Sequence, residues 1–130
     1  MRNNPKNYYL MCAEAQEIQE KWEPQTGDTV KINGDKKLQI ISFTDDKNIH
    51  FESKQSYNIE QCIWIPLIEQ LNKYLKPYGM WFKFYKFVHE SWKEYLQTFK
   101  SQEELLLAFV MYYFHKKIWK KNQWIIGSLT

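Results

Sequence analysis

The feature that most constrains this fold is an apolar run of ten residues near the C-terminus, Leu105–Phe114. Glu103 and Glu104 precede the run, and a basic stretch beginning at His115 follows it. Ser101 and Glu104 have the spacing of a capping box, which satisfies free backbone donors at a helix start. Acidic residues at the start and basic residues at the end also complement the helix dipole. Because apolar side chains occupy nearly every side, we expect a buried helix at the centre of the protein.

Length and composition favour a single globular domain over residues 1–130. The chain is 44% hydrophobic and 18% aromatic, which is typical of a packed core rather than a disordered tail. The apolar run is too short to cross a bilayer, which needs about 20 residues, and the first residues lack a signal-peptide pattern. Two cysteines, Cys12 and Cys62, are fewer than a secreted disulfide scaffold usually carries. We therefore expect a cytoplasmic protein, without membrane insertion and with reduced thiols.

The first helix is expected over residues 6–22. Apolar residues recur there at steps of three and four, which indicates one buried stripe. Glu17 and Lys21 are placed for an ion pair on the outer side, and Pro24 and Gly27 then break the helix. The stripe consists of Tyr8, Met11, Ala15, Ile18 and Trp22.

A small antiparallel sheet should follow, because short β-rich runs alternate with turn residues. A two-residue turn at 33–34 would set Val30 opposite Lys37, whereas a three-residue loop at 34–36 sets Val30 opposite Ile40. The longer loop matches apolar faces, so we expect that register. The expected strands are 28–32, 37–43, 49–53 and 62–65, with a turn at 44–48.

The C-terminal half should be helical. Pro66 is suited to the first position of a short helix over 66–75, with Leu67, Leu71 and Tyr74/Leu75 inward. A long helix over Met80–Phe99 should lead directly into the capped helix at Ser101, as a helical hairpin or corner. The inward stripe of the long helix is expected to be Trp81, Phe84/Tyr85, Val88, Trp92, Tyr95/Leu96 and Phe99. Phe82 and Phe87 lie off this stripe and indicate a second buried face or an exposed interface patch.

The tail predicts a β-hairpin. If Lys121-Asn122 is a two-residue turn, Trp119 and Trp124 become directly opposed, and such an aromatic cross-strand pair stabilises a short ribbon.

No motif for catalysis or metal binding is found. His50, His89 and His115 share no ligand spacing with each other or with the cysteines. Glu14, Glu17 and Glu20 are explained by a solvated helix face, and nucleophile-elbow and phosphate-loop motifs are absent. We therefore expect no metal and no cofactor, and enzymatic activity is the least supported class of function.

Lysines interleaved with aromatic residues are the remaining candidate for a binding surface. Residues 1–71 hold eight basic and eleven acidic residues, whereas residues 72–130 hold ten lysines and four glutamates. Such asymmetry is typical of a surface that meets phosphates or an acidic partner, and aromatic platforms beside cations suit nucleotides or single strands. Arg2 is the only arginine, which weakens specific nucleic-acid readout. The candidate binding residues are Trp81, Tyr85, Lys116, Lys117, Trp119, Lys120, Lys121 and Trp124.

Three segments, 11–28, 63–71 and 99–125, resemble a family of small uncharacterised proteins encoded by phages and prophages of Gram-positive bacteria. The most specific is "SQEELLLAFVM" followed by two tryptophans. The family often has glycine between these tryptophans and a basic residue after the proline of the middle segment, where this chain has Lys121-Asn122 and Leu67. The resemblance implies a phage setting and a shared fold, and no activity.

Together these observations predict an α+β fold with an N-terminal helix, a small antiparallel sheet and a helical C-terminal half around a central buried helix. The leading functional hypothesis is a non-enzymatic phage accessory protein that binds and modulates a host or defence protein. The alternative is a nucleotide or single-stranded nucleic-acid binder that uses the lysine and aromatic surface of the C-terminal half. The expected partner is a host or phage protein, and a homodimer is left open.

Overall fold

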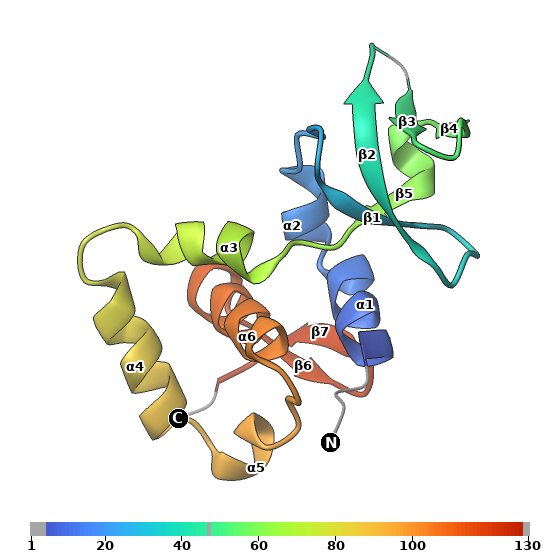
Figure 1. Cartoon of the computed structure of the whole chain (residues 1–130). Coiled ribbons are helices and arrows are strands. Elements are labelled where there is room, and N and C mark those ends of the chain that lie inside the picture. The colour runs from blue at the N-terminus through green and yellow to red at the C-terminus, as the bar shows by residue number, and fades with distance from the viewer. Residues whose placement is uncertain (1–4, 47, 129–130) are drawn as a thin grey trace.

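The computed structural model describes residues 5–46 and 48–128 and shows an α+β fold (Figure 1). A five-stranded antiparallel sheet forms one part of the molecule, and helices with a two-stranded hairpin form the other. Each part has its own hydrophobic cluster, and Trp64 packs against both. The predicted fold class, with an N-terminal helix and a helical C-terminal half, is confirmed.

The N-terminal helical segment is broken, so the prediction of one helix over residues 6–22 is wrong. α1 is Pro5–Glu14 and α2 is Gln16–Glu20, separated by Ala15, whose ψ of 73° lies outside the helical region. The predicted inward stripe is nevertheless correct, because the break keeps all its members on one side. Its members Tyr8, Met11, Ala15, Ile18 and Trp22 are all buried.

The break at Ala15 serves the contact between α2 and the sheet. The side-chain amide of Gln19 donates to the carbonyl of Cys12 at 3.0 Å. The same side chain donates to the carbonyl of Trp64 at 2.8 Å and accepts from its N–H at 2.9 Å. Gln19 therefore joins an edge of the sheet to the N-terminal helices.

The sheet has the strand order β4-β3-β2-β1-β5, with antiparallel neighbours throughout. Four strands match the predicted ones. β4 was not predicted, because a strand of two residues is too short to show an alternating pattern. A register shift interrupts the β2–β3 pairing between Ile41 and Phe43. The strands are β1 Thr29–Ile32, β2 Leu38–Thr44, β3 Ile49–Phe51, β4 Ser56–Tyr57 and β5 Cys62–Trp64.

The expected register of the first hairpin is wrong by one residue. Val30 pairs with Gln39 rather than with Ile40. A turn closes where the N–H of Asp35 donates to the carbonyl of Ile32 at 2.9 Å, and the Asp35 carboxylate then accepts from the Lys37 N–H at 3.1 Å, which lengthens the loop. Apolar matching misled because β2 has apolar residues on both faces, so that two registers each align one set of them.

The segment after the sheet contains two short helices, α3 at Ile68–Leu71 and the 3₁₀ helix η2 at Asn72–Leu75; another 3₁₀ helix, η1, precedes β5 at Ile59–Gln61. The prediction that Pro66 begins the helix is wrong, because α3 begins at Ile68. The carbonyl of Pro66 accepts from the Tyr8 hydroxyl at 2.6 Å. Leu67 was expected inward but is 44% exposed.

Leu71 and Leu75 are buried as expected, and Tyr74 is half-buried. Their burial fixes α3 and η2 against the helical core.

The predicted long helix over Met80–Phe99 is also interrupted. α4 is Met80–Glu90 and α5 is Lys93–Leu96. Ser91 between them has a ψ of 161°, an extended conformation, so α5 turns away from the axis of α4.

Helix α6, Gln102–His115, lies at the centre of the helical part, with α1, α3, α4 and α5 around it (Figure 1). Ser101 caps it, with its hydroxyl accepting from the Glu104 N–H at 3.1 Å. The Glu104 carboxylate accepts from the Lys100 N–H at 3.0 Å and from the Asn7 amide at 3.1 Å. The expected capping box is therefore half formed, because the returning bond reaches one residue earlier than Ser101.

The predicted C-terminal hairpin is confirmed, with β6 at Lys117–Lys120 and β7 at Gln123–Ile126. Trp119 faces Trp124, with ring centroids 5.0 Å apart. Lys121 and Asn122 have φ of 52° and 63°, the left-handed values that a two-residue hairpin turn requires.

Glu104→Ala should destabilise the fold by about 1–3 kcal/mol, because it leaves the Lys100 N–H and the Asn7 side-chain amide without the acceptor of two partly buried hydrogen bonds. Glu104→Gln keeps an acceptor oxygen and should cost less. Urea unfolding measures both, with Glu103→Ala as control, for which about 0.3–1 kcal/mol is expected from the helix dipole alone. Equal losses for Glu104→Ala and Glu103→Ala would contradict this role of Glu104.

The turn pair Lys121-Asn122 should be improvable. The double substitution Lys121→Asn and Asn122→Gly supplies the residues that tolerate left-handed backbone. We expect a stability gain of about 0.5–1 kcal/mol, read as a rise in Tm. Asn33→Ala, beside Gly34 in the β1–β2 loop, serves as a control that should not raise Tm. An unchanged or lower Tm for the double variant would refute the assigned turn.

Candidate functional site

The structure divides the predicted binding residues between two places. Trp81 and Tyr85 lie on α4, and the other candidates lie on or beside the C-terminal hairpin. The hairpin residues are Lys116, Lys117, Trp119, Lys120, Lys121 and Trp124. The two groups therefore have to be judged separately.

The two tryptophans of the hairpin hold the fold together. Trp119 is 8% exposed and its backbone N–H donates to the Tyr95 hydroxyl at 2.9 Å. The Trp124 indole N–H donates to the carbonyl of Met11 on α1 at 3.0 Å. Burial raises the pKa of Tyr95 to about 12, so its hydroxyl stays neutral and able to hold this contact. The backbone of Trp119 and the indole of Trp124 therefore anchor β6 and β7 to the helices.

The lysines of the hairpin differ in their surroundings. Lys117 forms an ion pair with Glu17, which replaces the expected pair between Glu17 and Lys21 because β6 brings Lys117 beside α2. The Lys116 ammonium lies 5.9 Å from the centre of the Tyr113 ring. Lys120 and Lys121 are exposed.

The predicted inward stripe of the long helix is correct in part, because several of its members pack against the helical core: Phe84, Val88, Tyr95, Leu96 and Phe99. The stripe through Trp81 and Tyr85 was expected inward, but these side chains are 60% and 59% exposed. Met80 and Phe87 are buried instead, and Phe87 packs edge-on against the Phe109 ring of α6 with centroids 5.5 Å apart. Trp92, another member of the predicted stripe, is also exposed. The helix is apolar on two sides, so spacing alone could not identify the side that faces α6.

An exposed aromatic surface results, which we call the α4 surface: Trp81, Phe82 and Tyr85. Phe82 is 65% exposed, and steps of three and four residues place neighbouring side chains on one side of a helix. The Lys86 ammonium lies 5.8 Å from the centre of the Phe82 ring. This surface contains the exposed aromatic residues of the predicted site, Trp81 and Tyr85, together with Phe82.

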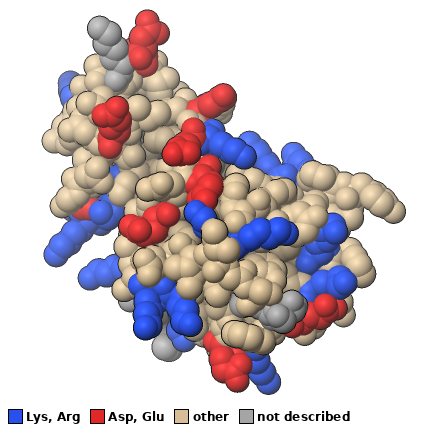
Figure 2. All heavy atoms as spheres, turned by 180° about the vertical axis from the view of Figure 1, so that it is seen from behind, with Lys and Arg blue, Asp and Glu red and all other residues tan. Residues whose placement is uncertain are grey.

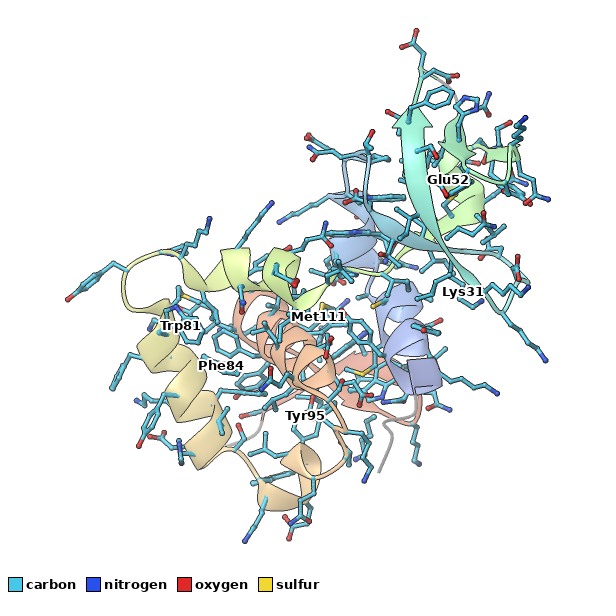
Figure 3. All side chains as sticks on the ribbon, in the orientation of Figure 1. Lys31, Glu52, Trp81, Phe84, Tyr95 and Met111 are labelled. Atoms are coloured by element: carbon cyan, nitrogen blue, oxygen red, sulfur yellow. The ribbon has the colours of Figure 1, made fainter. Side chains whose placement is uncertain are left out.

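Beside the α4 surface lies an apolar cavity of about 390 Å³, which we call the α4 groove. Trp81 borders it, and Phe84 points from α4 toward α6 (Figure 3), where its ring packs against Phe109 at 5.2 Å. Asn72 and Gln102 supply its polar groups. The full lining is Ile68, Asn72, Leu75, Trp81, Phe84, Val88, Gln102, Leu105 and Leu106.

The segment of residues 72–100, which contains η2, α4 and α5, is positive on balance. Residues 72–100 contain six lysines and two glutamates. Over the face seen in Figure 2, carboxylates gather more over the sheet part and lysines more over the helical part. The charge asymmetry in the sequence is thus also an asymmetry in space.

A second cavity, of about 290 Å³, lies between α2, β5 and η2. Parallel rings of Trp22 and Trp64 border it, with centroids 6.1 Å apart. The buried Asp28 carboxylate is already engaged by the Trp22 indole at 2.9 Å and by the Gln70 amide at 2.8 Å. The Asp28 carboxylate therefore stabilises the junction of the two hydrophobic clusters.

The thiols lie in the wrong environment for a nucleophile. Both cysteines are free and buried, and burial raises the pKa of Cys62 to about 11 and that of Cys12 further. Within residues 5–46 and 48–128 no group of three or more potential metal-binding side chains occurs. No helix in the same ranges is long and apolar enough to cross a membrane.

Glu17 and His115 form a titratable cluster at the end of α6. Partial burial acts to raise the pKa of Glu17, but hydrogen bonds and the charges of Lys117 and His115 outweigh it, so that pKa is lowered. Burial lowers the pKa of His115, with Lys21 and Lys117 acting in the same direction and Glu17 opposing. Both groups therefore bind protons more weakly in the folded protein than in the unfolded chain.

The free energy of unfolding should accordingly fall as pH decreases from about 7.5 to about 5.5, because the unfolded chain takes up a proton at His115 near pH 6.5 before the folded protein does. His115→Gln should flatten this fall. Urea midpoints at three pH values measure the slope, with the exposed His89→Gln as control. The same slope in wild type and His115→Gln would show that His115 is not responsible.

Comparison of this chain with protein families, curated proteins and solved structures finds no match.

Proposed function

We propose that this chain is a phage-encoded accessory protein that acts by binding a host or defence protein through the α4 surface and the α4 groove. The phage setting rests on the resemblance of residues 11–28, 63–71 and 99–125 to the phage family. The mode of action rests on the geometry of α4. Chemistry on a substrate is not part of the proposal.

The observation that carries the proposal is the exposure of three neighbouring aromatic side chains beside an apolar groove. Trp81, Phe82 and Tyr85 are each about 60% exposed or more. Contiguous apolar patches of this kind on a folded protein mark interaction sites, and aromatic residues are enriched at the centres of protein interfaces. The groove next to Trp81 offers a place for an apolar anchor residue of the partner.

The surrounding charge specifies the kind of partner. With six lysines and two glutamates in residues 72–100, an acidic surface that carries apolar side chains is complementary. A second copy would bring like charges together, which costs free energy and slows association. We therefore propose a heterologous acidic partner over a homodimer.

The nucleic-acid alternative keeps only the α4 half of its predicted surface. Trp119 is buried and the Trp124 indole N–H is hydrogen-bonded to α1, so the hairpin offers lysines without free indole faces. Stacking of bases would have to occur on Trp81, Phe82 and Tyr85. This alternative predicts binding that weakens steeply with salt.

Affinity capture from a lysate of a Gram-positive bacterium tests the proposal when wild type is compared with Phe82→Gln/Tyr85→Gln. Loss of two central aromatic contacts should cost at least about 2 kcal/mol, so capture of a specific protein should drop more than tenfold. Quantitative mass spectrometry of the bound proteins gives the ratio. The captured protein should have an acidic surface.

Ile126→Ser is the matched control, because Ile126 is an apolar residue 81% exposed on β7, outside α4. It should capture as wild type does. Equal capture by all three proteins, or capture of none, would refute the proposal. Co-purified nucleic acid that Phe82→Gln/Tyr85→Gln loses would favour the alternative instead.

A further inference from the structure

A third cavity, with a volume of about 380 Å³, lies between α1 and one face of the sheet and shares no residue with the α4 groove. We call it the α1 groove. Tyr9, Leu10 and Ala13 of α1 and Ile63 of β5 form its apolar wall. Tyr9, Leu10 and Ile63 are only partly buried and pack against the helical core. The apolar wall of the groove is therefore continuous with the helical core, and part of it is exposed to solvent.

The register of the sheet explains why this face is apolar but not closed. Lys31 pairs with Leu38 on one side and with Ile63 on the other, and directly opposed residues of antiparallel strands point to the same face. The opposite face, with Val30 and Ile32, is fully buried in the sheet cluster. Leu38, by contrast, is 37% exposed, so α1 covers only part of the face around Lys31.

Three lysines from three separate elements border the groove: Lys6 of α1, Lys31 of β1 and Lys36 of the β1–β2 loop. None of the described residues that line it is acidic. Within the described part of the chain, Lys31 and Lys36 make no ion pair. Figure 3 shows Lys31 near the end of the β1–β2 hairpin, above α1. Lys31 and Lys36 thus bring positive charge to this groove without an ion-pair partner among the described residues.

The combination defines the chemistry of a ligand. An apolar wall gives no advantage to a bare inorganic anion, and three ammonium groups give none to a neutral apolar molecule. The volume lies at the lower end of the range of about 300–1,000 Å³ typical of small-molecule sites. We propose that this groove binds a small amphipathic anion, with an alkyl or aromatic body on the α1 wall and a phosphate or carboxylate between the lysines.

NMR titration of the purified chain tests the site, with octyl phosphate and octanoate as probes, and octanol and inorganic phosphate as the two halves of the probe given separately. A nucleoside monophosphate tests whether an aromatic body replaces the alkyl one. Saturable shifts of the Tyr9, Leu10 and Ile63 amides are expected for at least one amphipathic anion. Its Kd should be at least tenfold lower than that of octanol or inorganic phosphate.

Two kinds of variant separate charge from shape. Lys31→Gln/Lys36→Gln should raise the Kd at least tenfold, whereas Lys37→Gln, the exposed neighbour that does not line the groove, should leave it unchanged. Ala13→Leu should weaken binding by filling the groove while keeping every lysine. Unchanged circular dichroism and Tm confirm that each variant is folded.

The proposal is overturned if no amphipathic anion gives saturable shifts. It is equally overturned if Lys31→Gln/Lys36→Gln and Lys37→Gln bind alike, or if the shifts occur on α4. Because the groove and the α4 surface share no residue, either proposal can fail while the other stands.

Discussion

The helix α6 has apolar side chains on nearly every side, and a helix of that kind has to be covered by protein on every side. Residues 106–111 are all buried, and the rest of the helical part is arranged to cover them. α4 supplies Phe84 and Phe87 against Phe109, and α1, α3 and the hairpin close the other sides.

Covering α6 also joins the two ends of the chain. The Trp124 indole reaches Met11, Lys117 reaches Glu17, and the Asn7 amide reaches Glu104. These contacts span about a hundred residues of sequence, so the hairpin and the N-terminal helices stabilise each other across the core. Three of the tail residues that were predicted to form a binding site, Lys117, Trp119 and Trp124, make such contacts with the helices instead.

The sequence predicted the elements that depend on local signals. The α6 cap at Ser101, the left-handed turn at 121–122 and the stripe from Tyr8 to Trp22 each follow from residues close together in the chain. Sequence reasoning failed where two apolar patterns compete. On β2, Leu38 and Ile40 lie on one face of the strand, and Gln39 and Ile41 lie on the other. Nothing local decides between such patterns, since the choice depends on which partner lies opposite in the folded protein.

The breaks in the helices were missed for a related reason. Ala15 is a strong helix former, and only the distant Trp64 backbone, which Gln19 binds, gives a reason for the chain to leave the helix there. On α4, both the side with Met80 and Phe87 and the side with Trp81 and Tyr85 have helical spacing. The candidate binding residues thus divide into two groups: those on α4 are exposed, whereas Trp119 of the C-terminal hairpin is buried and Trp124 is hydrogen-bonded to α1.

The competing apolar patterns on α4 leave one set of aromatic residues packed against α6 and another exposed. Burial of Phe84 and Phe87 satisfies α6, so the fold gains little from the aromatic rings of Trp81, Phe82 and Tyr85 on the opposite side. Exposed rings that the core does not use carry a risk of aggregation, and glutamine or lysine at these positions would form the helix as well. The same argument applies to the α1 groove, because Lys31 keeps open a face of the sheet that an apolar residue would close against α1. Both surfaces depart from what folding alone requires, and such departures are expected at functional sites.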